Sequence, residues 1–130
     1  MKKSSLGLAL LSLAVLAGCS SNGEREKNLE LLAANRASIL GTELPLEYGP
    51  LNIMRVNAKG STIEMMMVYN TDHPGAKPID QVLQSSIHSF CNNSDIRANL
   101  DVGIGYRIKM RNSRGQLMVD QLVTKENCKK

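Results

Sequence analysis

Aromatic side chains are nearly absent from this chain of 130 residues, which has no Trp, one Phe and three Tyr. Proteins that bind single-stranded nucleic acids stack bases on aromatic rings, so the composition argues against this class. A large excess of one charge is also lacking, because the chain has 16 Lys and Arg and 12 Asp and Glu, a net charge of +4. Without Lys2 and Lys3, which lie in a segment expected to be removed, the net charge is about +2, and we expect no nucleic-acid partner.

Patterns that carry catalysis are missing as well. The two histidines, His73 and His88, are expected to be solvated polar groups. His88 precedes Cys91 by three residues on a predicted helix, but no third group is placed to orient such a pair. Carboxylates occur singly, and no phosphate-binding, dinucleotide-binding or nucleophile-elbow pattern is present. We therefore expect a protein that is not an enzyme and that uses no metal and no cofactor.

The first eighteen residues are typical of a secretory signal peptide. Lys2 and Lys3 precede an apolar run from Leu6 to Leu16. A helix of that length spans about 16 Å, roughly half of a bilayer core, so the run is too short for a membrane-spanning helix. We expect residues 1–18 to be cleaved from the mature protein.

The apolar run ends in a match to the lipobox of bacterial lipoproteins. Leu16, Ala17, Gly18 and Cys19 fit this motif at every position; a plain secretory signal with a chance cysteine is the alternative. Similarity to lipoproteins implies that Cys19 becomes an acylated N-terminus, and its acyl chains would hold the protein at a membrane. In enteric bacteria an Asp after the lipidated cysteine retains a lipoprotein in the inner membrane, and this chain has Ser20 instead. We expect the lipoprotein sorting machinery to deliver it to the periplasmic face of the outer membrane.

Cys91 and Cys128 are the cysteines that remain when Cys19 is lipidated. In an oxidising compartment we expect them to form a disulfide. Closing a loop of about 37 residues would stabilise the fold by roughly 3 to 4 kcal/mol in the chain-entropy model. Two free thiols or half of a metal site are the alternatives, although no nearby His or Asp has supporting spacing.

Apolar periodicity predicts one α/β domain over residues 25–130, after a lipidated N-terminus and short tether at 19–24. Spacings of three and four predict an amphipathic helix over 24–40. Pro45, Gly49 and Pro50 then indicate an extended connection. A second helix begins at Pro78 and ends near Cys91, and a short helical turn over 94–100 follows.

Alternating patterns predict two β-hairpins, with strands over 51–56 and 62–69 and over 104–110 and 117–123. We therefore expect an antiparallel sheet of about four strands, an α+β arrangement with the helices packed on one face.

Met65, Met66 and Met67 form an unusual run in the second of these strands. Alternation places Met65 and Met67 in the core and turns Met66 and Val68 to the opposite face. Methionine also serves surfaces that accept helices of varied sequence. Met66, Val68 and Leu122 are therefore candidate contacts for a partner on the outward face of the sheet.

Several pieces of the chain occur together in the order that is found in one known family. They are the lipobox, Leu29-Glu30-Leu31-Leu32-Ala33, Leu44-Pro45-Leu46, Tyr48-Gly49, Lys59-Gly60, Cys91, Gly105-Tyr106-Arg107-Ile108, Arg114-Gly115-Gln116 and Cys128. With these pieces, the region from Leu44 to Cys128 resembles the AspS-like pilotins of the bacterial type II secretion system. The resemblance implies a lipoprotein that binds the C-terminal S-domain of the secretin subunit and carries it to the outer membrane. A periplasmic inhibitor or an envelope-stress module with another protein or a glycan as partner is the alternative.

Replacing the lipobox cysteine tests the expected anchor. Cys19→Ser removes the only sulfur at the cleavage site, so acylation should be abolished and the protein should be soluble or remain uncleaved in the inner membrane. Metabolic labelling with a radioactive fatty acid measures this directly. A variant that still takes up the label would contradict the assignment.

Overall fold

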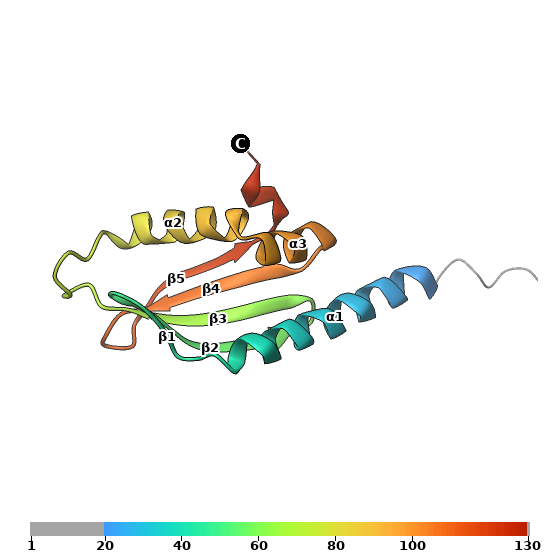
Figure 1. The fold of residues 1–130 in the computed structure, drawn as a ribbon, viewed down its shortest axis with the longest axis horizontal. Coiled ribbons are helices and arrows are strands. Elements are labelled where there is room, and N and C mark those ends of the chain that lie inside the picture. The colour runs from blue at the N-terminus through green and yellow to red at the C-terminus, as the bar shows by residue number, and fades with distance from the viewer. Residues whose placement is uncertain (1–19, 130) are drawn as a thin grey trace, which may run out of the picture.

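The computed structural model describes residues 20–129; the expected signal peptide and Cys19 lie outside them. The described part contains the α-helices α1 (Ser20–Gly41), α2 (Ile79–Asn92) and α3 (Ser94–Val102) and the short 3-10 helix η1 (Lys125–Cys128). One sheet holds β1 (Leu46–Tyr48), β2 (Leu51–Lys59), β3 (Thr62–Tyr69), β4 (Gly105–Arg111) and β5 (Leu117–Val123), arranged in that order (Figure 1). None of the described helices is long and apolar enough to cross a membrane.

The sheet differs from the predicted one in two respects. It has five strands instead of four, and β3 and β4 pair in parallel while the other neighbours are antiparallel. The parallel pair arises because α2 and α3 form a crossover that returns the chain to the end of the sheet where β3 began. β1 was not predicted, because a strand of three residues is too short to show an alternating pattern. Gly49, with φ of 63°, turns the chain at the end of β1 so that β2 pairs with it.

The helices were predicted at nearly their observed places. α1 begins four residues earlier than expected, so that residues 20–24, expected as a tether, are helical. Asn93 separates α2 from α3, and its side-chain oxygen accepts hydrogen bonds from the amides of Asp95 and Ile96, which caps α3. Gly103, with φ of 112°, ends α3.

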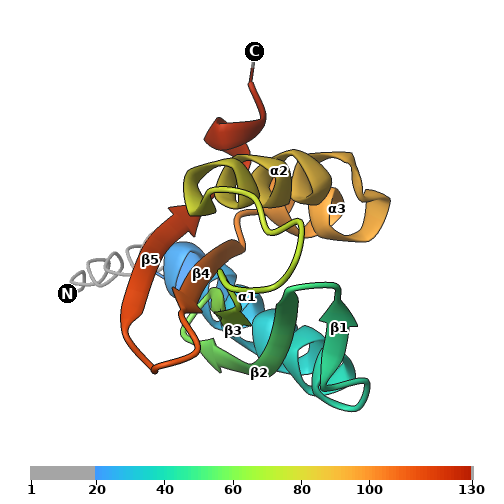
Figure 2. The same ribbon diagram turned by 90° about the vertical axis from the view of Figure 1, so that its left-hand side faces the viewer.

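One face of the sheet carries the core, and we call it the core face. On β3, Ile63, Met65 and Met67 are buried there, and each lies beside a buried residue of β4. All three helices contribute to the same cluster: Ala33 and Ala37 from α1, Phe90 from α2 and Leu100 from α3. The helices therefore pack on this face, as expected. Figure 2 shows the strands as a curved row with α2 and α3 on one side of it.

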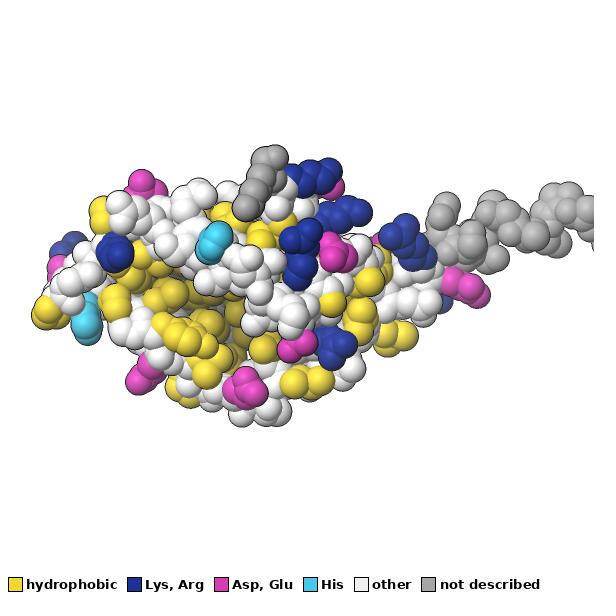
Figure 3. All heavy atoms as spheres, turned by 45° about the horizontal axis from the view of Figure 1, so that its top comes forward, with side chains coloured by type: hydrophobic (Ala, Val, Ile, Leu, Met, Phe, Trp, Pro, Cys, Tyr) yellow, Lys and Arg dark blue, Asp and Glu magenta, His cyan; other side chains and the backbone are white. Residues whose placement is uncertain are grey.

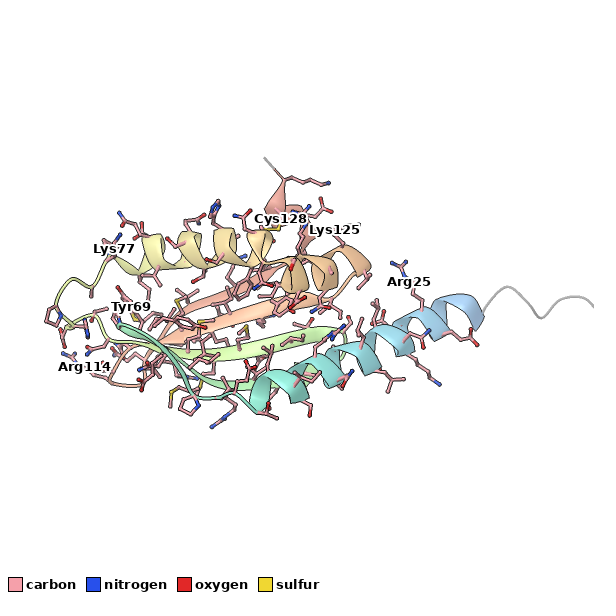
Figure 4. The ribbon with its side chains drawn as sticks, viewed as in Figure 1. Arg25, Tyr69, Lys77, Arg114, Lys125 and Cys128 are labelled. Atoms are coloured by element: carbon pink, nitrogen blue, oxygen red, sulfur yellow. A yellow bond between two sulfur atoms is a disulfide. The ribbon has the colours of Figure 1, made fainter. Side chains whose placement is uncertain are left out.

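The predicted disulfide joins Cys91, near the end of α2, to Cys128 in η1, with Cα atoms 5.4 Å apart. Thr124 shapes the turn before it: its hydroxyl accepts a hydrogen bond from the Glu126 amide, and its own amide donates to the Asn127 side chain. Figure 4 shows Cys128 beside the C-terminal end of α2. The disulfide thus attaches the segment after β5 to the helical layer.

Removing both disulfide cysteines tests what the bond contributes. In the Cys91→Ser/Cys128→Ser variant, the free energy of unfolding should fall by about 3 to 4 kcal/mol, because the unfolded chain regains the freedom of the opened loop. Denaturant titration of the two proteins measures the difference. The reduced wild-type protein is the control and should match the variant, and a fall below about 1 kcal/mol would contradict the expectation.

Candidate partner-binding site

The core face is covered unevenly by the helices. α1 packs mainly on β2, whereas α2 and α3 lie near β5 and β4, so part of the core face is left between α2 and β1. Figure 3 shows a hollow lined with apolar side chains below α2. We call this surface the apolar trough. It includes side chains from both borders, of which all but the more exposed Tyr48 are half-buried: Leu46, Tyr48 and Leu51 from β1 and β2, and Ile79, Val82 and Leu83 from α2.

The strand register explains why β1 contributes to the trough. Leu46 lies opposite Ile53, which is buried in the core, so Leu46 is on the core face. Tyr48 lies opposite Leu51 on the same face and is 59% exposed. An exposed aromatic ring beside half-buried aliphatic side chains is the composition of a protein-binding surface.

The helix that borders the trough is held at both ends. Before its N-terminus, the Tyr69 hydroxyl donates a hydrogen bond of 2.6 Å to the Lys77 carbonyl; Figure 4 shows both residues at that end of the sheet. Near its C-terminus, the Phe90 ring packs edge-on against the Tyr106 ring, with centroids 5.4 Å apart. The disulfide of Cys91 fixes the same end. The border formed by α2 is therefore fixed before any partner arrives.

Tyr106 is the buried polar group of this region. Asn99 of α3 donates a hydrogen bond of 2.8 Å to its hydroxyl, and burial raises the pKa of Tyr106 above its usual value. Tyr106 therefore stays neutral at physiological pH and serves the packing of α2 and α3 onto β4.

The three predicted contact residues lie on the opposite face, which we call the outward face. Met66 and Val68 on β3 are half-buried, and Leu122 on β5 is 41% exposed and lies over Gly105, which leaves room for it. β4 lies between the two strands. The structure therefore places all three on one face, as alternation predicted, but it does not bring Leu122 into one patch with the other two.

Charged side chains lie on the outward face beside Met66, Val68 and Leu122. Glu64 pairs with Lys59 at 3.4 Å and with Lys109 at 3.5 Å. Arg107 donates a hydrogen bond of 2.7 Å to Asp120, and this bond lowers the pKa of the Asp120 carboxyl. The outward face is thus a charged surface with apolar side chains set into it, whereas the trough is apolar.

No catalytic group emerges in the described part of the chain. The His88 ring forms a hydrogen bond with the Asn92 side chain, and Cys91 is in the disulfide, so the two cannot act as a Cys-His pair. Between residues 20 and 129, no three His, Cys, Asp or Glu side chains gather in a way that could hold a metal ion.

Periodicity did not reveal the trough because its residues come from distant segments. The region around Pro45 and Tyr48 reads as an extended connection, and its apolar residues alone give no sign that they face α2. The available signal was the half-apolar stretch Leu44-Pro45-Leu46 with Tyr48 in a segment expected to be an extended connection.

Removing the hydrogen bond between the Tyr69 hydroxyl and the Lys77 carbonyl tests how the start of α2 is held in place. Tyr69→Phe removes the hydroxyl and keeps the ring, so the free energy of unfolding should fall by about 1 kcal/mol. Chemical denaturation measures the change. The matched control is Tyr48→Phe at the exposed tyrosine, which should change stability by less than about 0.5 kcal/mol. Equal effects from the two substitutions would show that the bond does not stabilise the fold.

Comparison with known proteins gives one consistent family. A model of the family described as type II secretion system (T2SS) pilotin, S protein, matches residues 25–128. Among curated proteins, Pilotin AspS 2 of Escherichia coli O78:H11 (strain H10407 / ETEC) is 23% identical over 123 residues, covering 95% of this chain and 88% of the relative. Lipoprotein YghG of Escherichia coli (strain K12) is 22% identical with the same coverage.

Solved structures agree with these matches. The type II secretion system pilotin AspS from Vibrio cholerae is 71% identical with a TM-score of 0.80, over 83% of this chain and 99% of that one. EpsS, a pilotin from the Vibrio vulnificus type 2 secretion system, is 50% identical with a TM-score of 0.80, over 84% and 99%. A putative secreted protein of Pseudomonas aeruginosa, PA3611, shares the fold at 14% identity and a TM-score of 0.69, over 81% and 96%.

Proposed function

This chain belongs to the family of type II secretion system pilotins of the S-protein type, and we propose that it binds the C-terminal S-domain of the secretin subunit and promotes targeting of the secretin to the outer membrane and its assembly there. Pilotins are accessory proteins of the secretion system and not enzymes. The 71% identity to a solved pilotin, over nearly all of that chain, supports the proposal.

Attachment to the membrane through lipidated Cys19 is part of the same proposal. The lipobox supports it, and so does the lipoprotein name of one relative. Sorting by the lipoprotein machinery would bring the protein to the periplasmic face of the outer membrane. α1 begins at Ser20 and its N-terminal half extends past the sheet (Figure 1). Ala33, which is fully buried against the sheet, lies about 20 Å along the helix from its start, so the first half of α1 separates the proposed anchor from the core.

The observation that carries the proposal is the apolar trough. A partner helix with one apolar side needs an elongated surface that offers apolar contacts without fixed polar geometry. The trough offers such contacts between two borders, and α2 is fixed beforehand, so little ordering entropy is lost on binding. We therefore assign the S-domain helix to the trough.

The outward face remains the second candidate for this contact. Met66, Val68 and Leu122 are accessible there, but an apolar helix laid across them would bury Arg107 and Lys109 of β4 as well. Both residues are in ion pairs, Arg107 with Asp120 and Lys109 with Glu64. Removing an ion pair from water carries a desolvation cost that can exceed the attraction between its two charges. This cost favours the trough.

Substitution at Tyr48 tests the assignment. Tyr48→Ser removes an exposed ring at the edge of the trough, so binding of an S-domain peptide should weaken about tenfold or more, while the unfolding midpoint stays nearly unchanged. Isothermal titration calorimetry with a synthetic peptide of the secretin S-domain measures the affinity. The matched control is Leu31→Ser, because Leu31 is also strongly exposed but lies on α1; it should bind like the wild type.

Two outcomes would revise the proposal in different ways. Loss of peptide binding in Leu122→Ser but not in Tyr48→Ser would move the site to the outward face. Failure of the immobilised wild-type domain to retain the secretin from detergent-solubilised envelopes, together with no peptide binding, would overturn the pilotin role and favour a different protein or a glycan as partner.

A further inference from the structure

Basic side chains gather on the outward face although the whole chain is nearly balanced in charge. The register of the sheet places five of them there, on β2 and β4, with three acidic residues, one each on β1, β3 and β5. Glu64 pairs with Lys59 and Lys109, Asp120 pairs with Arg107, and Glu47 lies on the edge strand β1. Among the described residues, Arg55 and Arg111 are the basic residues of this face that form no ion pair. The five basic residues are Arg55, Lys59, Arg107, Lys109 and Arg111.

Basic residues lie next to both half-buried apolar residues of β3, Met66 and Val68. Met66 lies in register between Arg55 of β2 and Lys109 of β4, and Val68 has Arg111 beside it on β4. Each apolar side chain therefore has at least one long cationic side chain next to it. Arg and Lys can extend their charged groups past a shallow apolar contact to reach phosphates.

We propose that the outward face rests on the surface of a bilayer that contains anionic phospholipids. In the described part of the chain no helix covers this face, and it presents a sheet surface rather than a trough, so it suits a broad planar partner. The phosphate groups of the lipids complement Arg55 and Arg111, while Met66 and Val68 contact the region below the headgroups.

The proposed anchor would keep the domain close to a membrane. The inference rests on the proposed anchor at Cys19 for its setting, because an anchored domain lies within about the length of α1, roughly 33 Å, of the membrane. At such a distance the local concentration of lipid headgroups is high, and a few charge contacts are sufficient to orient the domain. With the outward face on the bilayer, the trough lies on the other side of the sheet and is open to the periplasm.

Vesicle binding by the unlipidated domain tests the proposal. Residues 20–130 contain every buried core residue, from Ala33 to Val123, and the disulfide, so this segment is expected to fold without its anchor. We expect it to sediment with vesicles of phosphatidylcholine and phosphatidylglycerol, and not with phosphatidylcholine alone. Each basic residue near an anionic surface strengthens binding about fivefold. The Arg55→Gln/Arg111→Gln variant should therefore bind about 25-fold more weakly.

A control variant with the same change in charge distinguishes binding through the outward face from a general attraction between a basic protein and an anionic membrane. Lys77→Gln/Lys125→Gln removes two exposed basic residues from the side of the molecule that carries α2 and η1, as Figure 4 shows. This variant should bind vesicles nearly as well as the wild type. Arg55→Gln alone, at an exposed position, should weaken binding about fivefold and serves as a check if the double variant is unstable.

Three results would overturn the inference. One is equal binding to both kinds of vesicle, and another is an equal loss in the outward-face and control variants. The third is an outward-face variant that keeps its vesicle binding but loses the S-domain peptide, because this face would then be the site of an acidic protein segment. No secretin is present in the vesicle assay, so its failure leaves the proposed pilotin role to be decided by the peptide titration.

Discussion

Tyr106 of β4 contacts both helices of the crossover at once. Its ring meets Phe90 of α2 edge-on, and its hydroxyl accepts a hydrogen bond from Asn99 of α3. On the sheet it lies beside Ile63 and Val123, so the buried ring joins the two hairpins to the helical layer. The position of α2, and with it the border of the apolar trough, depends on this buried contact and on the bond between Tyr69 and Lys77 at the other end.

Local patterns were sufficient for the three α-helices, for β2 to β5 and for the face that each residue of these strands occupies, but not for the short elements β1 and η1. Alternation from Thr62 to Tyr69 and from Ile104 to Met110 placed the core correctly, and counting cysteines identified the disulfide. Strand pairing between β3 and β4 was not predictable in this way, because it is set by where the crossover helices pack. The trough was missed for the same reason: alternation tells which side a residue faces but not whether a helix covers it.

The fold alone does not carry the function. PA3611 of Pseudomonas aeruginosa has the same architecture at 14% identity, which is evidence for the scaffold and for nothing more. The function of this chain therefore has to be argued from the surfaces on the two sides of its sheet. In this chain an apolar trough lies on one side, and a charged surface with Met66 and Val68 set into it lies on the other.

The parallel pairing of β3 with β4 has a consequence for the order of folding. The two hairpins are local and can form within microseconds. The parallel pairing of β3 with β4, which begins at Thr62 and Gly105, forms only after the intervening helices have folded over the sheet. Until then each hairpin has an open inner edge that could pair with a strand of another chain. Arg107 and Lys109 alternate along one of these edges, and their charges discourage such pairing while the chain completes its sheet.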